Sequence, residues 1–190
     1  LVKQIDREKQ PDLNPKNMAA GSSKKVWWKC PEGPDHKWET RTSHRTGAGS
    51  GCPYCYGEGV SVTNNLETTH PDIVKQWHPS KNGNKKQSQF RAGSKQKIVW
   101  TCDKGHEWNQ MIRNRTKGSP ACPYCSGNLI NHENSFGSKF PKLLSEWDYE
   151  KNSGKDPYTI APASGKKVWW KCPESPDHEW KSPIYSRTAN

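Results

Sequence analysis

The sequence has few hydrophobic residues and no long apolar run. Only 29% of its 190 residues are hydrophobic, with three Phe and two Met among them. No stretch approaches the roughly 18 consecutive apolar residues that a membrane-spanning helix requires. A chain this polar cannot bury one large core, and it stays disordered unless something besides apolar burial stabilises it. The composition therefore excludes a membrane span and predicts several small domains rather than one large one.

The sequence is rich in tryptophan, cysteine and positive charge. It contains ten Trp and seven Cys, residues that disordered chains avoid. Small domains with weak cores are stabilised by disulfides or by metal ions, and the spacing of the cysteines distinguishes the two. The formal net charge of +11 favours a polyanionic partner, either nucleic acid or an anionic membrane surface.

One unit of about 70 residues occurs three times. Its first cysteine recurs at Cys30, Cys102 and Cys172. A short segment that contains Val or Ile and Trp comes directly before each of these cysteines. A His-x-Trp motif follows, and Arg-Thr comes nine residues after each His. Such a period is the signature of a tandem array. The His-x-Trp and Arg-Thr motifs are His36-Lys37-Trp38 with Arg45-Thr46, His106-Glu107-Trp108 with Arg115-Thr116, and His178-Glu179-Trp180 with Arg187-Thr188.

The repeats predict three domains, which span residues 1–60, 61–128 and 129–190. The first is incomplete at its N-terminus. The third lacks a Cys-Pro-Tyr-Cys pair, since the spacing of 16 residues from His to the next Cys in the other copies would place that cysteine at position 194, past Asn190. We therefore expect this segment to belong to a longer array within a larger protein or assembly.

Each repeat is predicted to combine a short helix with a β-hairpin. Apolar residues lie on one helical face over 71–78 and over 141–149. Residues 26–30 and 38–42 alternate in the manner of two hairpin strands. The predicted fold class is therefore a small, metal-stabilised α+β fold in tandem zinc-ribbon or treble-clef-like repeats, each with a Cys3His zinc site.

The spacing of cysteine and histidine predicts the metal sites. Two ligands close together, followed after a spacer by Cys-x-x-Cys, can surround a tetrahedral ion, and three thiolates with one imidazole suit zinc. Four protein ligands leave no open position for catalysis, so the sites are structural. Gly57 and Gly127 can adopt the left-handed conformation that closes the Cys-x-x-Cys turn. The predicted ligands are Cys30, His36, Cys52 and Cys55; Cys102, His106, Cys122 and Cys125; and, in the incomplete third site, Cys172 and His178.

Three alternatives to zinc remain open at this point. Disulfides would leave one of seven cysteines unpaired and would not require the recurring His. Cys-Pro-Tyr-Cys is also a glutaredoxin dithiol motif, although a glutaredoxin places it in a βαβ unit that this chain lacks. An iron–sulfur cluster could use the same ligands, but one His per site suits it less well.

The motifs W-x-C, G-H-x-W, R-T and C-P-Y-C together resemble those of the zinc-ribbon or treble-clef zinc finger repeat family. The second copy carries the resemblance best, from Asn65-Leu66 through Trp100-Thr101-Cys102 and Gly105-His106-Glu107-Trp108 to Cys122-Pro123-Tyr124-Cys125. The family occurs as tandem arrays, sometimes joined to small nuclease domains, which implies nucleic-acid binding by association only. The first and third copies depart from it through a longer turn between Cys and His.

Basic and aromatic residues at repeating positions are candidates for nucleic-acid contact. Arginine and lysine along stacked modules can follow a phosphate backbone, and an exposed indole can stack on bases. For the arginine of each Arg-Thr motif, the alternative is a structural bracing role. Most Trp residues are expected to build the small cores. The candidate contacts are Arg41, Arg45, Arg113, Arg115, Lys117, Arg187, Trp27 and Trp169.

The favoured function is a zinc-binding tandem-repeat module that binds DNA or RNA, mainly through phosphate contacts from basic loops. The alternative is a zinc-stabilised protein-interaction scaffold or structural subunit of a large complex. No catalytic constellation is visible, so an enzymatic domain, if there is one, would lie outside this segment. No small-molecule substrate and no membrane partner are predicted. Free cysteine ligands favour a reducing intracellular compartment.

Overall fold

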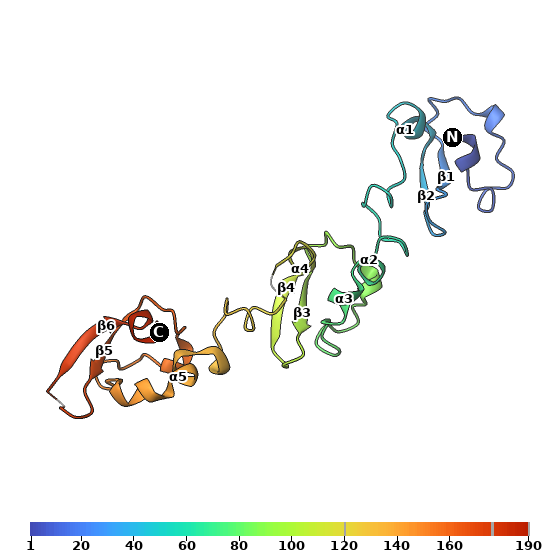
Figure 1. The fold of residues 1–190 in the computed structure, drawn as a ribbon. Helices are drawn as coiled ribbons and strands as arrows, with labels where there is room; N and C mark the ends of the chain where they lie inside the picture. Colours follow the sequence, from blue (N-terminus) through green and yellow to red (C-terminus); the bar gives the residue numbers. More distant parts are fainter. Residues whose placement is uncertain (120, 176, 190) are drawn as a thin grey trace. The chain divides into compact units, whose positions relative to one another are not determined.

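Each repeat is built on a two-stranded sheet that is followed by one short α-helix (Figure 1). The computed structural model describes residues 1–119, 121–175 and 177–189. The first and third sheets are antiparallel hairpins, as the alternation predicted. The strands and following helices are β1 (Lys25–Lys29), β2 (Lys37–Arg41) and α1 (Thr42–Thr46); β3 (Lys97–Thr101), β4 (Glu107–Met111) and α4 (Ile112–Thr116); and β5 (Lys167–Lys171), β6 (Glu179–Pro183) and α6 (Tyr185–Thr188).

Short helical segments precede each sheet and are shorter than predicted. The helix expected over 71–78 ends at Val74, and the one expected over 141–149 is a 3-10 helix that ends at Glu146. Both stop because the next Trp bridges to a strand in extended backbone. Within the described residues, no helix is long and apolar enough to cross a bilayer. These segments are η1 (Val2–Gln4) and η2 (Pro15–Asn17); α2 (Leu66–Thr69), α3 (Pro71–Val74) and η3 (Gln87–Gln89); and η4 (His132–Asn134), α5 (Phe136–Lys139), η5 (Pro141–Glu146) and η6 (Pro157–Thr159).

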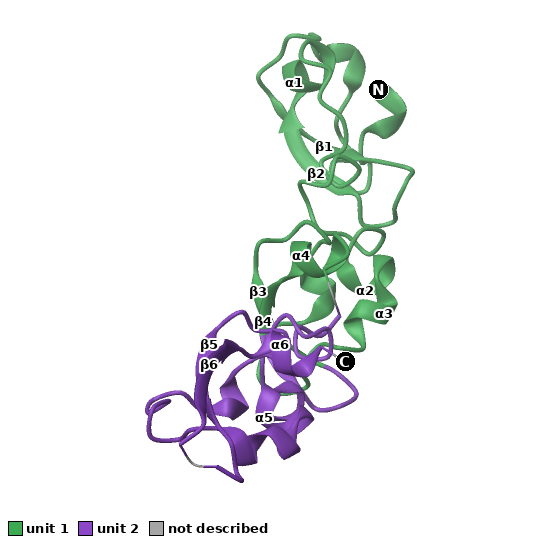
Figure 2. Ribbon diagram, turned by 60° about the vertical axis from the view of Figure 1, so that its left-hand side comes forward, with its two compact units in different colours: residues 1–101, 109–119 green, residues 102–108, 120–190 purple. Residues whose placement is uncertain are grey.

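The chain divides into two compact units (Figure 2). Unit 1 comprises Leu1–Thr101 and Asn109–Ser119, and unit 2 comprises Cys102–Trp108 and Pro120–Asn190. The division passes through the second hairpin, whose tip belongs to unit 2. Each complete set of predicted metal ligands therefore lies inside a single unit.

A small apolar core lies on the inner face of each hairpin. In β1, Val26 and Trp28 are buried, while the residues between and beside them face outward. One residue from the preceding segment bridges to the buried Trp of each hairpin, and in the second and third repeats two indoles meet edge-on with centroids 5.8 Å apart. The low hydrophobic content thus supports three separate small cores. The bridging pairs are Ile5 with Trp28, Trp77 with Trp100, and Trp147 with Trp170.

A side-chain amide from the preceding loop pairs with the first strand of each hairpin. Asn152 accepts the backbone N–H of Trp169 at 2.9 Å and donates to its carbonyl at 2.7 Å. The amide therefore satisfies the strand-edge N–H and shares the carbonyl with the backbone N–H of Asp148, which donates to it at 3.3 Å. The recurring pairs are Gln10 with Trp27, Asn82 with Val99, and Asn152 with Trp169.

Candidate metal centre

The first ligand set lies at the tip of the first hairpin. Cys30 follows β1 and His36 precedes β2, and the N–H of Cys30 donates to the carbonyl of His36 at 3.0 Å. The Cys-Pro-Tyr-Cys turn brings Cys52 and Cys55 to the same place. Nδ1 of His36 lies 3.7 Å from Sγ of Cys52 and 3.6 Å from Sγ of Cys55, and the Sγ atoms of Cys30 and Cys55 are 3.7 Å apart.

The second set has the same arrangement at the tip of the second hairpin. The N–H of Cys102 donates to the carbonyl of His106 at 3.1 Å. Nδ1 of His106 lies 3.6, 3.5 and 3.4 Å from the Sγ atoms of Cys102, Cys122 and Cys125. In both sets the four ligand atoms lie within 4.8 Å of one another. Gly127, with φ of 75°, closes the turn in the predicted left-handed conformation, as Gly57 does in the first set.

The donor atoms fit zinc in number, type and spacing. A tetrahedral zinc ion with Zn–S of about 2.3 Å and Zn–N of about 2.0 Å requires S···S distances of about 3.8 Å and S···N distances of about 3.5 Å. The observed separations match these tetrahedral edges. They are also much longer than an S–S bond, and all seven cysteines are free, so these thiols are not paired as disulfides.

The electrostatics of the sulfur cluster also favour a bound cation. Burial together with hydrogen bonds from Cys30 and Cys52 raises the pKa of the Cys55 thiol to about 12. The same causes, with Cys122 and Cys102 as neighbours, raise the pKa of Cys125 to about 11. Three thiolates in so small a volume repel one another unless a cation lies among them. Zinc would therefore hold each hairpin tip and its Cys-x-x-Cys turn together.

The outer nitrogen of each ligand histidine is held by residues that follow the Cys-x-x-Cys turn. A neutral imidazole that binds metal through Nδ1 carries its proton on Nε2. Nε2 of His36 lies 3.1 Å from Oγ of Ser61 and 2.8 Å from Oγ1 of Thr63. Nε2 of His106 lies 3.1 Å from Oε2 of Glu133 and 3.0 Å from the side-chain amide of Asn131. These acceptors fix the tautomer and orientation of the rings, as outer-shell partners of zinc ligands do.

A recurring asparagine orders the segment that carries these acceptors. Asn64 donates to the carbonyls of Tyr54 and Gly59 at 2.9 and 3.0 Å and accepts the N–H of Ser61 at 2.9 Å. Asn134 makes the same three contacts after the second Cys-x-x-Cys turn. The connection between repeats is therefore a defined turn that covers the histidine.

The third repeat has the hairpin tip but only two of the ligands. The N–H of Cys172 donates to the carbonyl of His178 at 2.9 Å, as in the other tips. The His178 side chain is exposed, whereas His36 is 2% exposed. Gly33 explains part of this difference, because a Cβ there would lie 2.6 Å from the His36 ring, and Ser175 occupies its position in the third repeat.

Tandem hairpins whose tips carry Cys3His sets define a zinc finger array. The family described as "Probable Treble clef zinc finger domain" matches residues 1–58, 73–128 and 143–190, and the chain belongs to this family. No curated protein matches the chain. Residues 59–72 and 129–142, which contain the acceptors for the two histidines, lie outside the family matches.

Loss of the hydrogen bonds to Nε2 is expected to weaken metal binding without changing the ligand count. The double substitution Ser61→Ala and Thr63→Val leaves His36 without these acceptors, so zinc affinity at the first site should fall about 10- to 100-fold. Competition with a colorimetric chelator measures the two sites in one sample, and the unaltered second site is the internal control. A zinc affinity at the first site that is unchanged from the unmodified protein would contradict this role.

Burial of the recurring arginine favours the bracing role, which the sequence left open beside phosphate contact. Arg45 and Arg115 are only 7% and 6% exposed. The Arg115 guanidinium donates to Oε1 of Gln76 at 2.6 Å and to the carbonyl of Ser119 at 3.0 Å, and it lies 5.8 Å from the centroid of a Trp100 ring. Burial leaves such a group no free face for phosphate.

The corresponding arginine of the third repeat is half-buried in the same position. Arg187 donates to Oε2 of Glu146 at 2.6 Å and lies 5.0 and 5.3 Å from the rings of Trp170 and Trp180. A guanidinium between two indoles joins the hairpin to the helix that follows it. The sequence left bracing and phosphate contact equally open. Burial favours bracing for Arg45 and Arg115, and the contacts with Glu146 and two indoles favour it for Arg187.

The other predicted contacts remain at or near the surface. Arg41, at the end of β2, and Lys117, at the end of α4, are exposed, and Arg113 is half-buried. Trp27 and Trp169 are half-buried on the outer faces of their hairpins. These side chains are available to a partner, in contrast to the buried arginines.

Proposed function

We propose that the chain is a nucleic-acid-binding zinc finger array within a larger protein or assembly. The outer faces of its first and third hairpins make the contacts, mainly to the phosphate backbone. The observation that carries this proposal is the recurrence of a lysine-rich outer face around a central Trp in these two hairpins. Zinc has a structural role, since it sets the geometry of the hairpin tips.

The outer face of the first hairpin is predominantly basic. Residues opposite one another in an antiparallel pair point to the same side of the sheet. Trp27 lies across from Glu39 at the centre of this face, and Lys25 lies across from Arg41 at one end. Lys29 and Lys37 form the other end. The two strands thus place four cations and one carboxylate on this face, and Glu8 of the preceding segment pairs with Lys37 at 2.6 Å.

The outer face of the third hairpin repeats this pattern. Trp169 lies opposite Lys181 at its centre. Lys167 and Lys171 lie on the same face of β5, with Glu179 opposite Lys171. In the second repeat Val99 replaces the Trp, and Lys97 is the only basic residue at the outward positions of β3 and β4. The first and third repeats therefore supply most of the proposed contacts.

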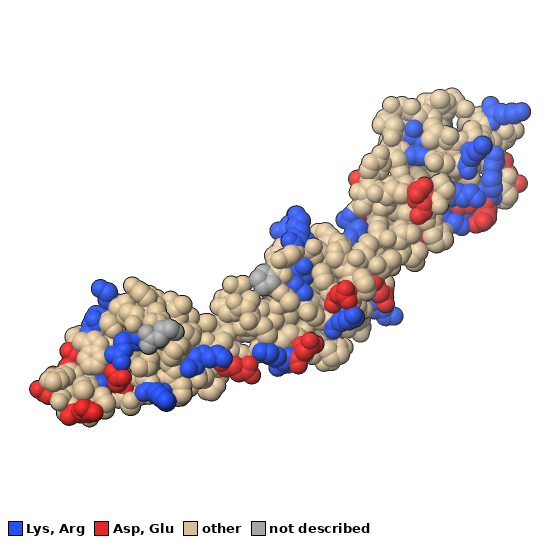
Figure 3. All heavy atoms as spheres, in the orientation of Figure 1, with Lys and Arg blue, Asp and Glu red and all other residues tan. Residues whose placement is uncertain are grey.

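Cations lie over both central indoles, which favours phosphate contact over base stacking. The Lys9 ammonium is 3.4 Å from the centroid of a Trp27 ring, and the Lys151 and Lys181 ammonium groups are 4.8 and 5.7 Å from a Trp169 ring. An ammonium in that position occupies the space that a stacked base would take. Figure 3 shows Lys and Arg in several groups over the visible face, with Asp and Glu among them.

Removal of two outer-face lysines is expected to reduce the salt dependence of nucleic-acid binding. Each lost phosphate contact lowers the slope of log K against log salt by about 0.9 for duplex DNA and about 0.7 for single strands. The double substitution Lys25→Gln and Lys29→Gln should therefore lower the slope by about 1.8 for duplex DNA or about 1.4 for single strands, and it should weaken binding across sequences. Gel-shift titrations over single- and double-stranded DNA and RNA at several salt concentrations measure both quantities.

The matched control removes the same charge from an exposed loop. Lys85→Gln with Lys86→Gln changes the net charge equally, in the exposed loop before η3 and outside the two proposed contact faces, and should leave the slope almost unchanged. An equal decrease of the salt slope in the control variant would show that the effect comes from net charge alone. No binding, or binding insensitive to salt, would overturn the proposal and favour the protein-interaction scaffold.

A further inference from the structure

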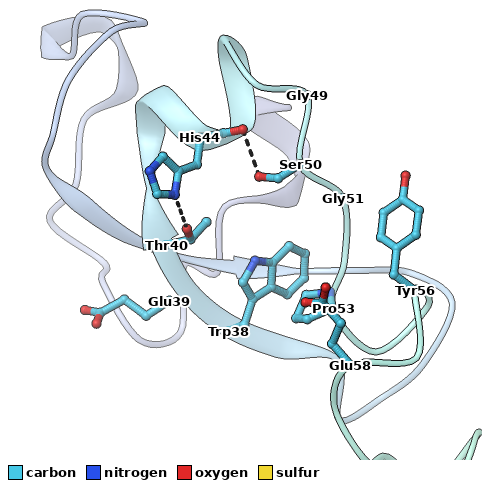
Figure 4. A pocket seen from close by; sticks show the side chains of 10 residues that line it. All are labelled: Trp38, Glu39, Thr40, His44, Gly49, Ser50, Gly51, Pro53, Tyr56 and Glu58. Carbon is cyan, nitrogen blue, oxygen red and sulfur yellow. Dashed lines mark hydrogen bonds between the residues drawn. The ribbon is translucent and has the colours of Figure 1, made fainter. Parts of the chain in front are cut away.

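A hollow in the first repeat is lined without Lys or Arg among the residues that the structure describes. It measures about 530 Å³ and lies between β2, the loop after α1 and the Cys-Pro-Tyr-Cys turn (Figure 4). Its prominent side chains are Trp38, His44, Tyr56 and Glu58, and none of the described residues that line it is Lys or Arg. In a chain with 30 Lys and Arg, such a site is electrostatically unsuited to a polyanion.

One wall of the hollow is an exposed tyrosine that packs on glycine. Tyr56 is 73% exposed. Its ring covers Gly51, where an added Cβ would lie 2.2 Å from Cε2 of the ring. Figure 4 shows Trp38 between Tyr56 and His44, so rings from three different segments border the hollow. The arrangement presents aromatic surface to whatever enters it.

The second repeat retains the framework of this hollow but not its chemistry. Its equivalent positions lie 70 residues further along the chain, where Trp108 and Pro123 correspond to Trp38 and Pro53. Gly51 and Tyr56 are replaced together, by Ala121 and Ser126. Ala121 carries a Cβ that would clash with a tyrosine ring, and Ser126 has no ring. The remaining differences also remove aromatic or acidic character: His44 corresponds to Asn114, Glu39 to Asn109 and Glu58 to Asn128.

Two aromatic rings beside carboxylates suit a cation. The ring quadrupole attracts an ammonium or guanidinium group, and a carboxylate at the rim adds a charge-assisted hydrogen bond. The Trp38 indole already has the Arg45 guanidinium 5.2 Å from its centroid. Glu39 points away from the rings in Figure 4 and lies 4.0 Å from Lys25, which leaves Glu58 as the carboxylate available to a ligand.

We propose that this hollow binds the side chain of an arginine or lysine from a protein partner. The proposal is independent of nucleic-acid binding, because Trp38 and the outer-face Trp27 lie on opposite faces of the hairpin. The first repeat would then present a basic face to a polyanion and an aromatic, acidic hollow to a basic peptide.

Titration with amino-acid derivatives tests the proposal on the intact, zinc-loaded chain. N-acetyl-arginine amide and N-acetyl-lysine amide should cause saturable NMR shifts of the Trp38 indole N–H and of the Gly49 and Gly51 amides. The neutral isostere N-acetyl-citrulline amide should cause none. Equal shifts with citrulline would overturn the proposal, as would adenosine monophosphate shifting these signals when neither cation does.

A double variant and a control variant test whether the cation binds beside Tyr56 and Glu58. Tyr56→Ser combined with Glu58→Asn introduces the residues of the second repeat, and it should weaken cation binding about tenfold. Both side chains are exposed, so the zinc content and the Trp28 signals should be unchanged. Glu67→Asn removes the same charge elsewhere and should have no effect. Unchanged affinity in the double variant would exclude this hollow as the site.

Discussion

Replacement of Cys122 with serine is expected to reduce the zinc content from two ions per chain to one. Cys122 is buried and lies 3.5 Å from Nδ1 of its partner His106, and three remaining ligands hold the ion far less well. Zinc binding contributes about 10–16 kcal/mol to folding in zinc-finger peptides, so the tip of the second hairpin should unfold in this variant. Elemental analysis combined with amide hydrogen exchange at residues 102–108 measures both effects.

The third repeat provides a matched control for this experiment. Cys172 occupies the same position in its hairpin as Cys102, but only His178 accompanies it. Cys172→Ser should therefore leave two zinc ions per chain. Persistence at two zinc ions in the Cys122 variant would show that the second Cys3His set is not a metal site. A fall in the Cys172 variant would contradict the expectation that Cys172 holds no zinc in this chain.

Replacement of Trp170 with alanine is expected to unfold the third repeat. Trp170 is fully buried, meets Trp147 and Phe136 edge-on, and donates its indole N–H to the carbonyl of Ser182 at 3.2 Å. Deletion of a buried indole costs about 3–5 kcal/mol, which is comparable to the whole stability of a small domain. Since the described part of this repeat holds only two metal ligands, its apolar core carries most of its stability.

The adjacent Trp169 is the matched control for the core variant. It lies on the same strand but faces outward, half-buried beneath two lysines. Trp169→Ala should cost about 1 kcal/mol or less. Limited proteolysis and hydrogen exchange over residues 136–188 measure the protection of the third repeat in the Trp170→Ala and Trp169→Ala variants. Similar protection in both variants would contradict the assignment of Trp170 to the core.

The ligand sets and the hairpins could be predicted from the sequence because their constraints are local and repeated. A Cys3His site requires particular residue types at particular spacings, and alternation along residues 26–30 indicates which side chains face inward. The short helices were less predictable, since Trp77 and Trp147 continue an apolar helical pattern but adopt bridging, extended positions.

The outer-shell acceptors could not be predicted because different residue types do the same task. Hydroxyl groups of Ser61 and Thr63 serve His36, whereas the carboxylate of Glu133 serves His106, so no repeated residue marks the position. The arginine of the Arg-Thr motif posed the opposite difficulty. It recurs in all three copies, but a guanidinium suits both a phosphate and a pair of indoles, and burial decides between them.

The turns that cover His36 and His106 affect where the boundary between one repeat and the next should be drawn. The family matches end at Glu58 and at residue 128, yet Ser61 and Thr63 lie past the first of these points and Glu133 past the second. A fragment excised at those limits would keep all four zinc ligands and lose the groups that orient the imidazole. In the first two repeats, the residues that support the zinc site therefore extend past the family match into the segment that leads to the next repeat.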